Sequence, residues 1–331
     1  MDDRHILSVF CMRLPGSARA ANGPSAQETG PYTLRLLLPA VLYRGRGTEE
    51  RDPPAPFFRG LLFEAGQDSR GGLVSPRLLG MSGPATRKGW EQALGWMFRP
   101  ACNIGAALAA SRRLPAGSEL DIWLALPYPP GNQKQVFGLV NGCRIRFCST
   151  PEHRLTALLW WVEEALARWN KLAAAVPGNR GTFRGFVWLK NYLDPDDVRL
   201  VNRLADALAS RGCRLLWCCN YGTTYAHRRD AVRVDGVYTR PTWFGFGKRN
   251  GEWVRTAAAF SAEHGLGMVI WVPDGSPDGL KRWLAMGKAH MAGSPHLFEL
   301  GDWRRSGLMD PGADVYHELF AYLREIGRGL P

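Results

Sequence analysis

The chain contains 331 residues, of which 45% are hydrophobic, and it carries a formal net charge of +12 at pH 7. A chain of this length can bury a large core, either in one large barrel or in two domains. The basic residues are spread along the sequence without a long run, so they do not form the stripe that marks a nucleic-acid-binding protein. Nucleic acid is therefore not an expected partner.

The cysteines and the first residues of the chain indicate the compartment. The seven cysteines show no C-x-x-C spacing, and Cys218 and Cys219 are adjacent within an apolar run, as is typical of buried free thiols in a reducing compartment. Asp2 and Asp3 stand where a signal peptide would be basic, and the apolar run at residues 6–12 is short. We therefore expect a cytoplasmic protein, and no stretch approaches the length of a membrane span.

Short apolar runs alternate with segments of helical periodicity over most of the chain. Residues 1–31 are rich in Gly, Ala, Ser and Pro, which predicts an irregular or mobile leader before a domain at residues 32–331. The predicted strands are residues 34–43, 57–64, 120–126, 182–192, 213–219, 234–241, 266–272 and 296–300. The predicted helices are residues 88–111, 151–176, 194–211, 253–264, 276–291 and 313–327, and a small hairpin is predicted around Asn141-Gly142.

This order of elements predicts a single-domain (β/α)8 TIM barrel in the α/β class. Eight apolar runs, mostly separated by helices, match the alternation that closes such a barrel through right-handed crossovers. The competing architecture is a doubly wound open sheet, which usually carries a Gly-rich phosphate-binding turn. Gly245-Phe246-Gly247 lacks the third glycine of that turn, so the barrel is favoured.

In a barrel, the residues just past each strand form one functional mouth. The candidate substrate-binding residues at these positions are Tyr43, Tyr128, Trp188, Lys190, Asn191, Asn220, Tyr221, Arg240, Trp243 and Trp271. Aromatic rings can stack on the apolar face of a sugar while amides and charges bind its hydroxyl groups, so the expected partner is a carbohydrate or another small polar ligand. The alternative is that the aromatic residues only fill the core, and the direction of Trp188 depends on its parity within the strand.

Three acidic residues are the candidate catalytic groups. Hydrolysis of a glycosidic bond normally requires one protonated and one ionised carboxyl group. Glu64, Asp274 and Glu299 follow predicted strands, and Glu64 directly ends an apolar run. The alternatives are a salt bridge between Glu64 and an arginine, and an ordinary turn role for Asp274 within Pro-Asp-Gly. Lys190, which ends a buried strand, is expected either to be paired or to face the mouth.

No cofactor and no metal ion is expected. The histidines are scattered without an H-E-x-x-H motif or His/Cys metal spacing. The sequence also contains no G-x-S-x-G nucleophile motif and no phosphate-binding Walker loop.

Several short motifs resemble those of a known family. They are Ala-Leu-Pro-Tyr-Pro at residues 125–129, Phe137-Gly138, Trp160-Trp161, Arg-Gly-Phe-Val-Trp at residues 184–188, Leu-Leu-Trp-Cys-Cys-Asn-Tyr at residues 215–221, Val-Asp-Gly-Val-Tyr at residues 234–238 and Gly-Leu-Gly-Met at residues 265–268. In this order they resemble the uncharacterised bacterial family called domain of unknown function 4855. The resemblance implies a glycoside-hydrolase-like barrel from about residue 34 onward.

The chain also departs from the pattern of that family. A glutamate follows the fourth strand in the family, and acidic residues occur in the seventh, whereas this chain has Lys190-Asn191 and Val269-Ile270-Trp271 at those places. The resemblance therefore leaves two hypotheses: a glycoside hydrolase that uses another pair such as Glu64 and Glu299, or a carbohydrate-binding pseudoenzyme. A polyanion-binding protein is a third hypothesis, which predicts a steep loss of binding as salt rises.

Overall fold

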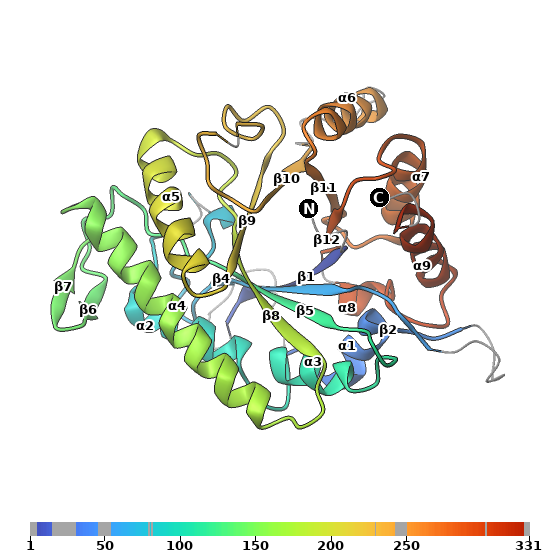
Figure 1. The fold of residues 1–331 in the computed structure, drawn as a ribbon, viewed down its shortest axis with the longest axis horizontal. Coiled ribbons are helices and arrows are strands. Elements are labelled where there is room, and N and C mark those ends of the chain that lie inside the picture. The colour runs from blue at the N-terminus through green and yellow to red at the C-terminus, as the bar shows by residue number, and fades with distance from the viewer. Residues whose placement is uncertain are drawn as a thin grey trace, which may run out of the picture.

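A computed structural model describes residues 5–14, 31–45, 54–78, 80, 82–228, 230–241, 250–301 and 303–327. Within these residues, eight parallel strands close into a barrel in the order β1-β12-β11-β10-β9-β8-β5-β4 (Figure 1). The strands are β1 (Ile6–Arg13), β4 (Gly60–Gln67), β5 (Leu120–Ala125), β8 (Gly181–Trp188), β9 (Arg214–Asn220), β10 (Gly236–Arg240), β11 (Gly267–Trp271) and β12 (His296–Glu299). The predicted (β/α)8 barrel is confirmed.

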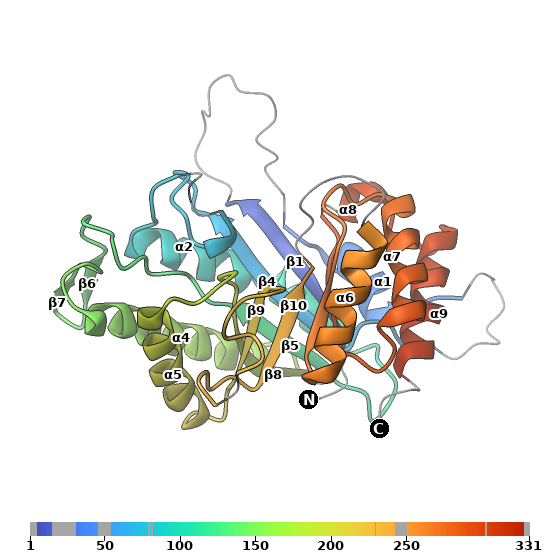
Figure 2. The ribbon, with the colours of Figure 1, turned by 90° about the horizontal axis from the view of Figure 1, so that it is seen from above.

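Helices surround this barrel on its outer side (Figure 2). They are α1 (Leu34–Val41), α2 (Arg87–Met97), α3 (Ile104–Ser111), α4 (Pro151–Ala174), α5 (Pro195–Ala209), α6 (Asn250–Glu263), α7 (Pro277–His290), α8 (Trp303–Ser306) and α9 (Asp314–Gly327), with a 3-10 turn η1 (Pro76–Leu78). Two small antiparallel pairs lie outside the barrel: β2 (Leu42–Tyr43) with β3 (Ala55–Pro56), and β6 (Gly138–Val140) with β7 (Cys143–Ile145). None of the described helices combines the length and the apolar character that a bilayer crossing requires.

The first predicted strand was wrong. Most of residues 34–43 forms helix α1, and the barrel strand is instead β1, within the segment that we expected to be irregular. An apolar run of this length fits a buried helix as well as a buried strand. Leu34, Leu37, Leu38 and Val41 have the spacing of one helical face, and the last three are buried.

Two other local predictions can be compared with the structure. The hairpin around Asn141-Gly142 is present as β6–β7, and both residues have positive φ angles of 50° and 79°, as a two-residue hairpin turn requires. The single helix predicted at residues 88–111 is two helices, α2 and α3. Asn103 separates them with a φ of 52°, and its side-chain oxygen accepts a hydrogen bond from the backbone N–H of Tyr32 at 2.9 Å.

The core has two parts, and the strand residues alternate between them. One cluster collects buried side chains from all eight barrel strands and therefore fills the lumen. Its members are Ile6, Leu62, Trp123, Ala125, Val187, Leu189, Leu216, Cys218, Tyr238, Val269 and Leu297, with Trp271 packed against it. A larger cluster lies between the barrel and the helices. A mouth residue must therefore belong to the lumen side of its strand.

Candidate functional site

Register places a set of polar and aromatic side chains at the mouth of the lumen. Glu299 of β12 lies beside Trp271 of β11, and Arg240 of β10 lies beside Asn220 of β9. Residues paired in register point to the same side of a sheet. Trp271 packs against the lumen cluster, and the Arg240 guanidinium bonds the Glu299 carboxylate. These strand-end residues therefore converge as predicted.

Glu64 of β4 is fully buried at this mouth. The Ser75 hydroxyl donates a 2.7 Å hydrogen bond to Glu64 Oε1, and Arg77 Nε forms an ion pair with the same oxygen at 3.1 Å. Burial raises the pKa of the Glu64 carboxyl above its usual value, against the lowering by Arg77 and Ser75. Glu64 Oε2 has no hydrogen-bond partner among the described residues.

Glu299 at the end of β12 is in the opposite electrostatic situation. Arg77 Nη1 lies 2.6 Å and Arg240 Nη2 lies 2.7 Å from Glu299 Oε1, and Arg240 Nε donates to Oε2 at 3.3 Å. Burial by itself would raise the pKa of this carboxyl, but the two guanidinium groups outweigh it and lower the pKa below its usual value. Glu299 is therefore held as a carboxylate.

One guanidinium group joins the two carboxyl groups. Arg77 contacts Glu64 with Nε and Glu299 with Nη1, so a single small planar group spans the gap between the acids. The two contacts are 3.1 Å and 2.6 Å long, so the carboxyl groups are close enough for one guanidinium group to bridge them. Two nearby carboxyl groups with pKa values shifted in opposite directions can act as a general acid and a base or nucleophile.

The base of the mouth is closed by a polar network around Arg240. Its Nη1 donates to Asn191 Oδ1 at 2.8 Å, and its Nη2 lies 3.5 Å from the sulfur of Cys218. Burial raises the pKa of the Cys218 thiol to about 11, so this group stays protonated and is not a thiolate nucleophile. Asn191 and Arg240 thus orient Glu299 from the side of β8–β10.

Lys190 is paired and does not stand free at the mouth. Its ammonium bonds Asp197 in α5 and lies 3.0 Å from Asp194 Oδ2, the N-cap residue of that helix. Asp197 also receives the Arg154 guanidinium, and the Tyr128 hydroxyl donates to it at 3.4 Å. Lys190 and Tyr128 therefore join β8 and β5 to α4 and α5, which is a structural role.

We expect the Asp197→Asn substitution to destabilise the fold by about 3 kcal/mol, because it leaves the buried cations of Arg154 and Lys190 without their shared carboxylate. Urea unfolding measures the change in the free energy of unfolding. Asp196→Asn, one residue earlier, removes an exposed pair with Arg199 and should cost less than about 0.5 kcal/mol. Equal effects of the two substitutions would contradict the buried role of Asp197.

Trp188 lies away from the mouth, although it was a candidate substrate-binding residue. Its side chain belongs to the cluster between barrel and helices and packs edge-on against Tyr128, with 5.8 Å between the ring centroids. Trp217, its partner in register, faces the same outer side and donates its indole N–H to the Lys190 carbonyl at 2.8 Å. Trp271, at the end of β11, packs against the lumen cluster.

Three further candidates also lie outside the mouth. Tyr43 stacks on Phe320 of α9 with 3.6 Å between ring centroids. Tyr221 packs edge-on against Trp253 of α6. Asp274 is exposed in a turn and accepts a hydrogen bond from the Ser276 N–H at 3.2 Å, so the turn interpretation fits it. Trp243 lies outside the described residues.

Three mouth residues were missed by sequence reasoning. Phe10 is paired in register with Glu64, but it lies in a segment whose composition predicts an irregular leader. Ser75 and Arg77 lie in the loop after β4, where Gly, Ser and Pro residues give no periodic signal.

Among the described residues, no group of three or more His, Cys, Asp or Glu side chains is arranged to hold a metal ion.

Comparison with known proteins identifies a family. Its sequence model, described as "Domain of unknown function (DUF4855)", matches residues 21–290. The chain belongs to this DUF4855 family. The match covers most of the DUF4855 barrel, including the strands that carry Glu64, Arg240 and Trp271. No curated protein gives a significant match to the chain.

Solved structures give only distant similarities. A glycoside hydrolase family 5 enzyme from Prevotella bryantii has a TM-score of 0.45 and 9% identity, with 98% of this chain and 96% of that chain covered. Tryptophan synthase from M. tuberculosis has a TM-score of 0.38 and 13% identity, covering 99% and 93%. A group IV chitinase from Ostrinia furnacalis has a TM-score of 0.39 and 9% identity, covering 82% and 92%. These similarities are too distant to bear on the chemistry of the DUF4855 mouth.

Proposed function

We propose that this barrel hydrolyses a glycosidic bond, with Glu64 as the general acid and Glu299 as the base or nucleophile. The supporting observation is the pair of mouth carboxyl groups on one arginine, with the pKa of Glu64 raised and the pKa of Glu299 lowered. Such a pair supplies the protonated and the ionised carboxyl group that glycoside hydrolysis needs.

The atoms left without partners suit contact with a substrate. Glu64 Oε2, Arg77 Nη2 and Asn220 Oδ1 are buried and have no hydrogen-bond partner within the part of the chain that the structure describes. Buried polar atoms are normally satisfied, so three unpaired atoms at the strand ends favour a polar ligand there. A protonated Glu64 would donate to the glycosidic oxygen, while Arg77 and Asn220 would donate to and accept from sugar hydroxyl groups.

Two aromatic side chains supply an apolar surface beside these groups. Trp271 is half-buried and paired in register with Glu299, and Phe10 is half-buried and paired with Glu64. Rings at such positions can stack on the apolar face of a pyranose. Each proposed catalytic carboxyl group therefore has an aromatic neighbour on the adjacent strand.

A second candidate function is carbohydrate binding without cleavage. Both Glu299 oxygens are engaged by guanidinium groups, and Oε1 receives Arg77 and Arg240 together. An oxygen engaged in this way is a weak nucleophile unless the arginines move. This observation favours a mouth that holds a sugar and does not cleave it.

We expect the purified protein to release reducing sugar from at least one member of a panel of plant, fungal and bacterial polysaccharides. Glu64→Gln should lower that rate by about 100-fold or more, because the amide cannot give a proton to the leaving oxygen. Asp274→Asn, which changes an exposed turn carboxylate after β11, should leave the rate unchanged. Saturable binding of a panel glycan without any hydrolysis would overturn the enzyme hypothesis in favour of the second candidate.

A further inference from the structure

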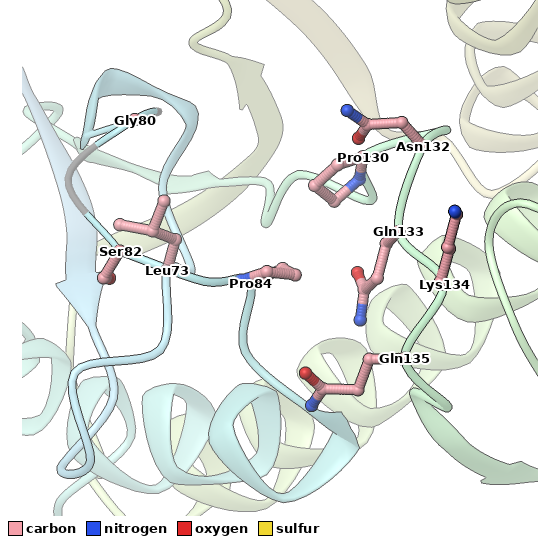
Figure 3. A pocket seen from close by; sticks show the side chains of 9 residues that line it. All are labelled: Leu73, Gly80, Ser82, Pro84, Pro130, Asn132, Gln133, Lys134 and Gln135. Carbon is pink, nitrogen blue, oxygen red and sulfur yellow. The ribbon is translucent and has the colours of Figure 1, made fainter.

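A cavity lies between the loops that follow β4 and β5. It is a cavity of about 340 Å³ lined by Leu73, Gly80, Ser82, Pro84, Pro130, Asn132, Gln133, Lys134 and Gln135 (Figure 3). This volume is at the lower end of the range of small-molecule sites, which is about 300 to 1,000 Å³. One wall of the cavity is formed by the loop after β4, which also carries Ser75 and Arg77. Both of these residues contact Glu64, so this wall is close in sequence to the proposed catalytic site.

Gln133 is the feature of this cavity that calls for a ligand. The residue is only 5% exposed, yet neither its side-chain oxygen nor its side-chain nitrogen has a hydrogen-bond partner among the described residues. Figure 3 shows the amide pointing into the space between Pro84, Pro130 and Gln135. A buried amide without partners costs about 1 to 3 kcal/mol of stability for each unsatisfied group. A buried polar group of this kind needs a partner, and a polar ligand in the cavity would supply one.

The backbone around this amide is fixed. Gln133 N–H donates to the Pro130 carbonyl at 3.1 Å, and the Gln133 carbonyl accepts from Cys148 N–H at 3.3 Å. In the opposite wall, within the loop after β4, Leu73 N–H donates to the Gly83 carbonyl at 2.8 Å. The unpaired amide is therefore presented by a preformed wall, which reduces the entropy lost when a ligand binds.

The two loops that form the cavity are also tied together. Tyr128 N–H, in the loop after β5, donates to the Val74 carbonyl, in the loop after β4, at 3.0 Å. Within the loop after β4, Leu73, beside Val74, forms a parallel bridge with Pro84. A backbone hydrogen bond therefore joins the two loops, and the bridge fixes the shape of the first one.

We propose that this cavity is a carbohydrate subsite that holds a sugar unit remote from the bond at Glu64 and Glu299, with Gln133 reading two neighbouring hydroxyl groups. A primary amide offers a donor and an acceptor side by side, which complements a pair of adjacent hydroxyl groups. Pro84 and Pro130 add apolar surface for the ring, and exposed Lys134 and Asn132 give further polar contacts. The choice of a sugar as ligand rests on the proposed function.

The test compares Gln133→Met with the wild-type protein. Methionine keeps the length of the side chain and removes both polar atoms. Calorimetric titration uses cello-, xylo- and chito-oligosaccharides from disaccharide to hexasaccharide as probes. We expect the longer members of one series to bind about tenfold more weakly to Gln133→Met, and the disaccharide to bind equally to both proteins. The melting temperature should stay the same or rise, because an unsatisfied buried amide has been removed.

The outcomes separate this subsite from the catalytic proposal. Equal affinities of both proteins for every oligosaccharide, or no saturable binding to the wild-type protein, would overturn the subsite, whatever Glu64→Gln does to hydrolysis. Weaker binding to Gln133→Met together with no hydrolysis by the wild type would support the subsite and reject the catalytic role of the carboxyl pair. A matched substitution, Asn179→Met, removes an amide that caps the end of α4 and should not change the affinities.

Discussion

Replacing Glu299 with glutamine should reduce hydrolysis by about a thousandfold or more for every substrate, including aryl glycosides with good leaving groups. The substitution keeps the shape of the side chain but removes the negative charge that Arg77 and Arg240 hold in place. Without it, the proposed pair lacks the carboxylate that attacks the sugar or activates water on the opposite side of the ring from Glu64. Initial rates on natural glycans and on aryl glycosides measure the loss.

Glu64→Gln is the matched control, because it should separate the two substrate classes. A leaving group of low pKa departs without protonation, so Glu64→Gln should retain most of the rate on activated aryl glycosides while losing it on natural glycans. If Glu299→Gln loses hydrolysis of both substrate classes and Glu64→Gln loses only that of natural glycans, Glu64 is the general acid. Glu299 is then the nucleophile or the general base. A Glu299→Gln protein with the wild-type rate would reject the assignment.

Glu299→Gln also leaves two buried arginines without a charged partner, so its folding must be measured beside its activity. Breaking a buried ion pair costs about 3 to 5 kcal/mol, and the rates should therefore be compared at temperatures where both proteins are folded by circular dichroism. Oligosaccharide affinity provides a second readout. A structural role would lower activity only in proportion to the folded fraction, whereas a catalytic role lowers it in fully folded protein.

The position of the carboxyl pair could be predicted from the sequence because parallel strands place their carboxyl ends on one side. Glu64 and Glu299 each follow an apolar run, and this was sufficient to bring them to one mouth. Arg77 could not be found in the same way. It lies in a short 3-10 turn within a loop, and only the folded chain shows that its guanidinium reaches both acids.

The direction of strand side chains was not predictable where the pairing is irregular. The register between β5 and β8 shifts between Ile122 and Trp123, and Gly185 on the facing strand has a φ of 146°. Phe183 and Phe186 consequently both pack on the outer side, three residues apart, and the strict alternation of a strand is lost. Trp188 inherits this shift and faces the helices. A bulge of this kind leaves little trace in the sequence beyond a glycine.

Lys190 illustrates a further limit. Sequence reasoning left open whether the lysine is paired or faces the mouth, because both outcomes satisfy the rule that a buried charge needs a partner. The residues that decide it, Asp194 and Asp197, stand only four and seven positions later, where their pattern predicts a helix start. Asp194 does cap α5, and the same residue also binds the lysine.

The amino-terminal end of the barrel carries a pair of buried histidines that should make the fold sensitive to acid. His5 precedes β1 and His296 begins β12, with 5.2 Å between their ring centroids. His5 Nδ1 accepts the His296 backbone N–H at 3.2 Å, and His296 Nε2 bonds the Tyr322 hydroxyl at 2.8 Å. Burial, then His296 and Arg59, lower the pKa of His5 to about 3, and burial lowers the pKa of His296 to about 4.

Both rings therefore stay neutral in the folded protein while they bind protons in the unfolded chain at mildly acidic pH. The unfolded state binds more protons below the ordinary histidine pKa of about 6.5, so stability falls as the pH falls through that value. Each pKa unit corresponds to about 1.4 kcal/mol, and the pair should lower the free energy of unfolding by about 4 kcal/mol between pH 7.5 and pH 5. Urea unfolding at several pH values measures this slope.

Single substitutions isolate the contribution of each ring. His5→Asn keeps an acceptor near the Nδ1 position, His296→Gln keeps a polar atom near Nε2, and each should remove about half of the pH-dependent loss. His290→Gln, at an exposed position in α7, should retain the full loss. The comparison uses the slope of stability with pH, so a fixed destabilisation by either substitution does not affect it.

Carboxyl groups titrate near pH 4, and the range above pH 5 therefore reports mainly on the histidines. A free energy of unfolding that stays constant from pH 7.5 to pH 5 would show that the two rings are not held neutral in the fold.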